Sequence, residues 1–237
     1  MQSFLPYLFL LFCFGCLDDD DAISPPTQME PPASAINITY LALGDSYTIG
    51  TSVEAEDRWP TQLAAALVAD SIRVTTLDYV ATNGWTTGEL INGIASRRDE
   101  LAPTYDLVSL LIGVNNQYRG MPLPQYQEQF EELLRTAIEF AGGDTSRVFV
   151  VSIPDYAYTP FGNGSEEISN DLTRFNAAAN FIVDDYGIPF YNITPISQEG
   201  LTAPALVAAD NLHPSGKQYG RWVREVLRVP VLGLLSQ

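Results

Sequence analysis

The chain has 237 residues, of which 46% are hydrophobic and 17% are charged. This length and composition favour one folded domain with a full hydrophobic core over a disordered chain or two small domains. Its 12 Lys and Arg residues are outnumbered by 29 Asp and Glu residues, which gives a formal net charge of −17. Because most of the surface potential is then negative, nucleic acid is not expected as a partner.

An almost unbroken apolar run occupies residues 4–17. Crossing a bilayer takes about 20 apolar residues, so a run of this length is typical of an export signal. Gly15 directly before Cys16 resembles a bacterial lipoprotein signal, whose cleavage leaves a lipid-modified Cys16 as the first residue. We expect residues 1–16 to be such a signal peptide, and the protein to be lipid-anchored to a membrane of the bacterial cell envelope, with surface exposure as one option. An ordinary secretion signal and an uncleaved anchor are the alternatives, because Cys13 stands where such signals carry leucine.

Residues 17–36 contain four consecutive aspartates, Asp18 to Asp21, followed by two Pro-Pro pairs. This mixture resists helix and sheet, so it predicts an extended tether. The acidic run is either a solvated spacer or a surface-export signal like that of some lipoproteins. No cysteine follows Cys16, so the domain expected over residues 37–237 must fold without an internal disulfide.

From Ile38 onward, short apolar runs alternate with longer segments of helical periodicity, the pattern of a parallel sheet covered by helices. The expected strands are Thr39–Leu43, Arg73–Tyr79, Leu107–Ile112, Arg147–Ile153 and Ile188–Ile193. The expected helices are Pro60–Ala69, Thr87–Leu101, Leu123–Ala141, Glu166–Tyr186 and Ser215–Leu227. The sequence therefore predicts an α/β fold, a three-layer α/β/α sandwich around a five-stranded parallel sheet. Ligands of such sheets bind at the carboxyl ends of the strands, so residues directly after strands are candidates for chemistry.

Ser46 follows the first expected strand, in the segment Gly44-Asp45-Ser46. A serine hydroxyl is a poor nucleophile at neutral pH unless a base lies within hydrogen-bond reach. The only histidine in the chain is His213, and Asp210 precedes it by three residues. An aspartate that holds one ring nitrogen leaves the other free to take the serine proton and return it to a leaving group. We therefore predict a Ser46-His213-Asp210 catalytic triad.

A tetrahedral intermediate also needs hydrogen-bond donors for its oxyanion. Asn83-Gly84 after the second strand predicts a tight turn with an unobstructed N–H, and Asn115 after the third strand offers a side-chain amide. Together with the Ser46 N–H, these groups make three donors. One such donor is typically worth about 2.7 to 4 kcal/mol in the transition state, so we predict an oxyanion hole of Ser46, Gly84 and Asn115.

Four sequence blocks resemble, in the same order, those of the SGNH/GDSL hydrolase family: Gly44-Asp45-Ser46-Tyr47, Gly84, Gly113-Val114-Asn115 and Asp210-Asn211-Leu212-His213-Pro214. The resemblance covers residues 39 to about 228. It implies a flavodoxin-like fold and hydrolysis of esters or thioesters without a cofactor. It also implies the same triad and oxyanion donors. The family commonly has aspartate after the asparagine of the third block, where this chain has Asn116, so the charge of that aspartate is missing here.

Three further residues are candidates for substrate binding. Trp85 either stacks against a sugar ring or packs as a core side chain. Arg119 either binds an anionic group of the substrate or forms an ordinary salt bridge. Tyr156 follows the fourth strand and either walls the pocket or serves turn and packing roles. One histidine and no cysteine after Cys16 leave only carboxylates as metal ligands, so no metal site is expected.

The leading interpretation is an exported serine ester hydrolase that works through an acyl-Ser46 intermediate. The sequence shows no long apolar lid, which favours short, acetyl-like esters, such as those of carbohydrates, and the expected partners are a small-molecule or glycan ester and a membrane. A thioesterase, a lysophospholipase-type acyl hydrolase or an acyltransferase would use the same triad. A cell-surface glycan-binding lipoprotein that has lost activity is the alternative from another class, although binding alone requires no nucleophile paired with an oriented base. The sequence does not predict an oligomeric state.

Overall fold

The computed structural model describes residues 35–236 together with Met1. Cys16, the rest of the predicted signal peptide after Met1, and residues 17–34 of the predicted tether lie outside the described residues. The first strand begins at Ile36, inside the segment expected to be tether, because Ile36 pairs with Ile72 on the neighbouring strand. The sheet therefore begins three residues earlier than the apolar pattern indicates.

Within residues 35–236, five parallel strands form one sheet in the order β2-β1-β3-β4-β5. The expected five-stranded parallel α/β fold is confirmed. The strands are β1 (Ile36–Gly44), β2 (Ile72–Ala81), β3 (Leu107–Leu111), β4 (Val148–Val151) and β5 (Phe190–Tyr191). The last strand is shorter than expected because only two of its residues pair with β4.

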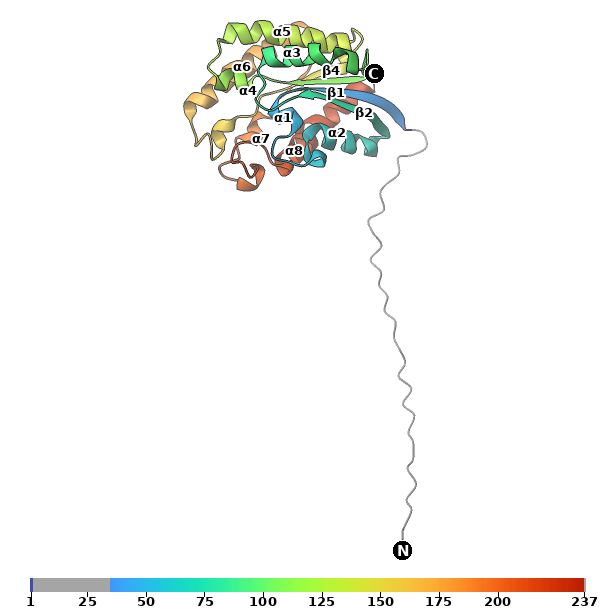
Figure 1. The fold of residues 1–237 in the computed structure, drawn as a ribbon, viewed down its shortest axis with the longest axis vertical. Coiled ribbons are helices and arrows are strands. Elements are labelled where there is room, and N and C mark those ends of the chain that lie inside the picture. Colours follow the sequence, from blue (N-terminus) through green and yellow to red (C-terminus); the bar gives the residue numbers. More distant parts are fainter. Residues whose placement is uncertain (2–34, 237) are drawn as a thin grey trace. The chain divides into compact units, whose positions relative to one another are not determined.

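Helices cover both faces of the sheet (Figure 1). One face carries α3 (Thr87–Arg97), α5 (Leu123–Phe140) and α6 (Glu166–Asp185). The other carries α2 (Trp59–Leu67), α8 (Gly216–Arg221), a π-helix over Trp222–Leu227 and α9 (Arg228–Leu235). The last helical segment therefore runs eight residues beyond the expected end at Leu227. None of the helices within residues 35–236 is both long and apolar enough to cross a membrane.

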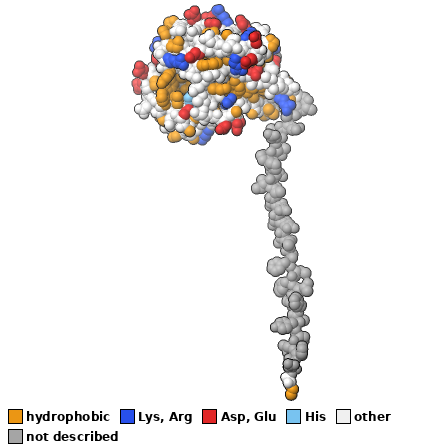
Figure 2. Space-filling view, viewed as in Figure 1, with side chains coloured by type: hydrophobic (Ala, Val, Ile, Leu, Met, Phe, Trp, Pro, Cys, Tyr) orange, Lys and Arg blue, Asp and Glu red, His pale blue; other side chains and the backbone are white. Residues whose placement is uncertain are grey.

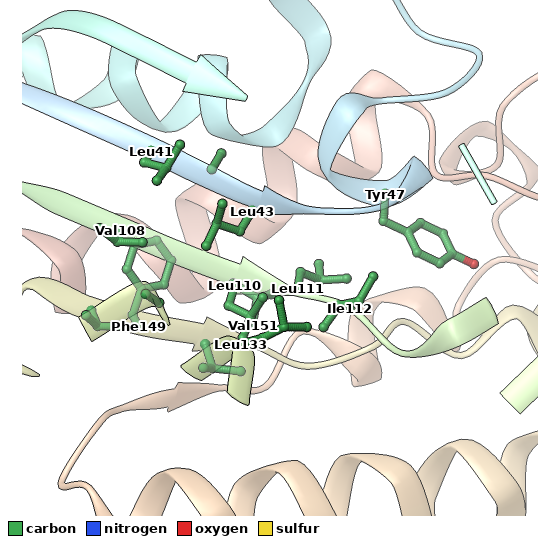
Figure 3. Close-up of a cluster of buried hydrophobic side chains, with 14 of the residues drawn as sticks. Leu41, Leu43, Tyr47, Val108, Leu110, Leu111, Ile112, Leu133, Phe149 and Val151 are labelled. Carbon is green, nitrogen blue, oxygen red and sulfur yellow. The ribbon is translucent and has the colours of Figure 1, made fainter. Parts of the chain in front are cut away.

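The core lies on both faces of the central strands, as a parallel sheet between helix layers requires. Figure 3 shows apolar side chains of β1, β3 and β4 in contact with one another and with α5. Besides Tyr47, those labelled are Leu41, Leu43, Val108, Leu110, Leu111, Ile112, Leu133, Phe149 and Val151, all at most 2% exposed. In α5 the buried residues Tyr126, Phe130, Leu133 and Ala137 recur at helical spacing, which gives this helix one apolar face. Acidic and basic side chains both occur on the outer face drawn in Figure 2, interspersed with apolar ones.

The strand register brings three loops together. Gly44 at the end of β1 pairs with Ala81 at the end of β2 and with Leu111 at the end of β3. The carboxyl ends of these three strands are therefore level. The segments that follow them carry Ser46, Gly84 and Asn115, so the sheet places all three at one edge.

Candidate active site

The segment that carries Ser46 is a sharp turn from β1 into the short helix α1 (Ser46–Ile49). A Cβ atom on Gly44 would lie 2.2 Å from the Thr48 hydroxyl and 2.5 Å from the Leu111 carbonyl oxygen, so the turn has no room for a side chain there. The N-cap is Asp45, whose Oδ1 accepts the Tyr47 N–H at 3.0 Å. Ser46 is the first residue of the helix, and its N–H therefore has no acceptor within the helix.

Asp45 is fully buried, and its second carboxylate oxygen has no hydrogen-bond partner among the described residues. Burial disfavours the charged form and raises the pKa of Asp45 to about 7, although the Tyr47 N–H acts in the opposite direction. A buried carboxyl group with a raised pKa therefore lies one residue before the candidate nucleophile Ser46.

His213 and Asp210 lie in the loop between residues 207 and 214. The two ends of this loop are joined by an antiparallel β-bridge between Val207 and Pro214. His213 Nδ1 lies 2.6 Å from Asp210 Oδ2, while Asp210 Oδ1 accepts the backbone N–H groups of Leu212 and His213, both at 2.9 Å. One carboxylate thus shapes the turn and orients the ring that the turn carries.

The hydrogen bonds to Asp210 also determine its charge. Partial burial acts to raise the pKa of Asp210, but the hydrogen bonds that it accepts outweigh burial and lower the pKa to about 2. Asp210 is therefore ionised at neutral pH, as a residue that stabilises an imidazolium must be.

Ser46 and His213 line the same pocket, which has a volume of about 190 Å3. Ser46 is 4% exposed and His213 is 7% exposed. The Tyr47 ring packs beside the imidazole, with ring centroids 5.5 Å apart. Within residues 35–236 the Ser46 hydroxyl makes no hydrogen bond to His213, and such bonds often tighten only when substrate is bound. The pocket residues are Ser46, Tyr47, Asn83, Val114, Asn115, Tyr118, Tyr156, Phe161, Leu212 and His213.

The predicted oxyanion donors lie on the two neighbouring loops. Gly84 has φ of 85°, a backbone conformation that favours glycine. Asn115 lines the pocket, and its Nδ2 donates to the Trp85 carbonyl at 2.9 Å, which fixes the amide and leaves its second N–H for another acceptor. Gly84 is not among the pocket residues, although the adjacent Asn83 is.

Asn116, the departure from the family pattern, is fully buried in the short helix α4 (Val114–Tyr118), where its side chain contacts the first residue of α3. Its Oδ1 accepts the Thr87 N–H at 3.0 Å, and its Nδ2 donates to the Thr87 hydroxyl at 2.7 Å. That hydroxyl in turn lies 2.6 Å from Gln129 Oε1. A neutral amide both accepts and donates here, which an ionised carboxylate does not do. The missing charge is thus replaced by a second hydrogen bond.

The structure places two of the three tentative substrate-binding residues away from the pocket lining. The Trp85 ring lies against α3, where a Cβ atom on Gly93 would come within 2.2 Å of it, so the position fits the packing alternative. Arg119 donates to the Gly84 carbonyl oxygen at 2.6 Å and to Glu89 at 3.2 Å, which fits the salt-bridge alternative. Tyr156 does line the pocket, and its hydroxyl donates to Gln117 at 2.9 Å.

Several pocket residues carry no motif that would have revealed them in the sequence. Tyr118 and Phe161 are 61% and 51% exposed at the pocket, and their ring centroids lie 6.1 Å apart. Both also contact the Tyr156 ring, at 6.4 and 6.2 Å. Aromatic residues are common in any core, so only the tertiary structure shows that these three form one wall. Within the described part of the chain, no group of three or more His, Cys, Asp or Glu side chains could hold a metal ion.

Comparison with solved structures shows the same fold in several proteins at low sequence identity. The crystal structure of TesA is 19% identical, with a TM-score of 0.61, and the match covers 83% of this chain and 97% of that one. Axe2, an acetylxylan esterase from Geobacillus stearothermophilus, is 18% identical, with a TM-score of 0.61 and coverage of 86% and 96%. The psychrotrophic esterase EstA from Pseudoalteromonas sp. is 18% identical, with a TM-score of 0.60 and coverage of 84% and 96%. No curated protein matches the chain significantly.

The family comparison is decisive because it spans the whole catalytic region. The model of the GDSL-like lipase/acylhydrolase family matches residues 42–221, from the strand before Ser46 to the helix after His213. That is most of the domain, and it includes every residue of the predicted triad and oxyanion hole. The chain therefore belongs to the GDSL-like lipase/acylhydrolase family and is a carboxylic ester hydrolase.

Proposed function

We propose that the protein hydrolyses short-chain, uncharged carboxylic esters, with acetylated carbohydrates as the substrate class, through an acyl-Ser46 intermediate. The observation that carries the proposal is that Ser46, Asn115 and the Asp210-bound His213 meet at one small pocket.

The proposed chemistry uses the residues at that pocket together with Gly84, which adjoins the pocket residue Asn83. Ser46 Oγ attacks the ester carbonyl carbon while His213 Nε2 accepts the hydroxyl proton. The carbonyl oxygen becomes an oxyanion, which accepts hydrogen bonds from the Ser46 N–H, the Gly84 N–H and the Asn115 amide. The intermediate then collapses, the carbon–oxygen bond to the alcohol breaks, and His213 returns the proton to that alcohol. Water, activated by His213, repeats the cycle on the acyl-Ser46 ester and releases the carboxylic acid.

The pocket volume supports a short acyl group. Pockets that bury drug-sized ligands occupy about 300–1,000 Å3, whereas this one has about 190 Å3. Its lining residues include no Asp, Glu, Lys or Arg, so it offers no ion pair to a charged acyl group. The net charge of −17 also disfavours anionic substrates over neutral ones.

The aromatic wall supports a carbohydrate as the alcohol part. Tyr118 and Phe161 expose large parts of their rings at the pocket that contains Ser46. An exposed aromatic ring offers a flat apolar face with little conformational entropy to lose, which suits a sugar ring. One protein of the same fold, Axe2, is an acetylxylan esterase, and its likeness to this chain adds support.

The experiment compares the purified full-length protein with Ser46→Ala on p-nitrophenyl acetate, butyrate and octanoate and on acetylated xylo-oligosaccharides. We expect acetate to be the best of the three synthetic esters, acetic acid to be released from the oligosaccharides, and Ser46→Ala to lose a factor of about 10^4 or more in kcat. Preference for octanoate would contradict the short-chain proposal. Release of acetate from the synthetic ester alone would contradict the carbohydrate part, and transfer of the acyl group to an added alcohol would identify an acyltransferase.

We also propose that the enzyme is exported and anchored to a membrane of the bacterial cell envelope by lipid on Cys16. The apolar run of residues 4–17 and Gly15 before Cys16 support this location. Labelling cells with radioactive palmitate should mark the wild-type protein and leave Cys16→Ser unlabelled. Equal labelling of both, or of neither, would contradict the anchor.

A further inference from the structure

We call the loop of residues 207–214, which carries His213, the base loop. One of its contacts involves a residue that no sequence motif indicated. The Ser52 hydroxyl donates to Asp210 Oδ2 at 2.5 Å. The same oxygen lies 2.6 Å from His213 Nδ1. Asp210 therefore accepts four hydrogen bonds: two at Oδ1 from its own turn, and two at Oδ2, from the imidazole and from a serine 158 residues away in the chain.

A short hydrogen-bonded segment of backbone connects the nucleophile Ser46 to Ser52. Helix α1 ends at Ile49 and is capped by Gly50, which has φ of 70°. The N–H groups of Gly50 and Thr51 both bond to the Ser46 carbonyl oxygen at 3.0 Å. The segment that holds Ser46 is thus tied to the residue immediately before Ser52.

Ser52 itself has φ of 68°, a conformation that costs energy for any residue other than glycine. Such outliers persist where the surrounding structure holds them, and they gather at functional sites. Glycine would remove the backbone cost at this position but would supply no hydroxyl. The presence of serine here therefore agrees with a use for the side chain.

We propose that Ser52 is a positioning residue of the triad, whose hydroxyl holds the Asp210 carboxylate against the His213 ring and ties the base loop to the nucleophile segment. This inference rests on the proposed function, because it assumes that Asp210 and His213 act on Ser46. Ser52 does not line the pocket, so it acts through Asp210 and not by contact with substrate.

Removing the hydroxyl has two expected consequences. Asp210 Oδ2 loses one of its two partners, so the carboxylate and the ring that it holds become less well oriented. Removing that partner also changes the environment of the proton on His213 Nδ1, which lies against the same oxygen. The first effect lowers kcat, and the second is visible in the NMR signal of that proton.

Other ionisable groups surround this contact and must stay constant in the test. Tyr47 on α1 and Tyr219 on α8 interact electrostatically with Asp210. Glu54 and Asp57 line the groove beside Ser52. Substitutions of Ser52 leave all four in place, so a change between variants reports the hydroxyl.

The test uses the full-length protein and the variants Ser52→Ala and Ser52→Gly. Ser71→Gly is the matched control, because Ser71 also has positive φ, of 61°, and its side chain makes no hydrogen bond among the described residues. We expect both Ser52 variants to lose about tenfold in kcat on the acetate ester, with KM changed by less than about twofold, whereas Ser71→Gly keeps the wild-type values. If Ser52→Gly is as active as wild type, the hydroxyl has no role and the proposal fails.

His213 is the only histidine in the chain, so its NMR signals can be followed without overlap from other histidines. The chemical shift of the proton on His213 Nδ1, which faces Asp210 Oδ2, should change in both Ser52 variants and stay unchanged in Ser71→Gly. An unchanged chemical shift in both Ser52 variants would overturn the proposal. This measurement needs no ester, so it still tests the Ser52 contact if the wild-type protein hydrolyses none of the substrates, an outcome that would count against the proposed function alone.

Discussion

The two sides of the pocket are held in different ways. On the oxyanion side, Asn115 and the turn at Gly84 lie next to a buried hydrogen-bond network. Asn116 and Thr87 are fully buried and bond to each other. Helix α3 begins beside them with a reciprocal capping box between Thr86 and Glu89. On the base side, the Asp210 side chain is 29% exposed and sits in an irregular loop. That loop depends on hydrogen bonds to one carboxylate.

The difference matches what each side has to do. Oxyanion donors stabilise charge best when they are already in place and need no reorganisation during the reaction, which a buried hydrogen-bond network provides. A general base exchanges a proton with three different oxygens in each cycle, those of the serine, the leaving alcohol and the attacking water, so its ring needs orientation together with some freedom. A single ionised carboxylate supplies that orientation. Damage to the base side should therefore reduce activity, and damage to the oxyanion side should also reduce stability.

The largest effect should come from Asp210→Asn, which breaks the base side. The amide cannot hold the imidazole in the required tautomer, so kcat should fall by about 10^4. The amide oxygen still accepts the Leu212 and His213 N–H groups, so the free energy of unfolding should fall by less than about 1 kcal/mol. Steady-state kinetics and thermal melting would measure the two quantities. Asp57→Asn removes a neighbouring carboxylate that does not contact His213 and should leave kcat unchanged. A fall in kcat of less than tenfold for Asp210→Asn would contradict the triad.

The next effect concerns Asp45, which caps the helix that begins with Ser46. Because the pKa of Asp45 is about 7 in the folded protein and 3.8 for an ordinary aspartate, the unfolded chain releases this proton first as pH rises. The contribution of Asp45 to stability is thus fully present below about pH 4 and is lost as pH rises to about 7, by roughly 4 kcal/mol at most.

Asp45→Asn removes this titration while keeping an acceptor for the Tyr47 N–H. Denaturant unfolding at pH 4, 5, 6, 7 and 8 should therefore show the variant gaining stability relative to wild type between pH 4 and 7, and no further above that. A difference between the two proteins that stays constant with pH would show that Asp45 is not held neutral by burial.

The smallest effect should come from Asn116→Ala, which breaks the oxyanion side. It leaves the buried Thr87 N–H without its acceptor, so the free energy of unfolding should fall by about 1–3 kcal/mol. Because Asn115 is the adjacent residue, kcat should fall as well. Asn180→Ala on the exposed face of α6 is the control and should keep both values. If Asn116→Ala melts at the wild-type temperature, the buried network does not distinguish the two sides.

Much of the fold could be predicted from the sequence, because its signals are local. The apolar runs placed all five strands in the right segments, and strands covered on both faces leave such runs by necessity. Ser46, Gly84 and Asn115 each directly follow a strand, and the level ends of parallel strands then bring them to one edge. The contact between Asp210 and His213 could be predicted because the two residues are three positions apart.

What the sequence by itself determined was therefore the order of the strands and helices along the chain and the residues that reach the edge of the sheet. Only the tertiary structure decided which partner each side chain meets. Arg119 bonds to Gly84, 35 residues away, and Ser52 bonds to Asp210, 158 residues away. Neither spacing leaves a periodic pattern, because a hydrogen bond between distant segments is set by how the loops pack and not by the residues beside it.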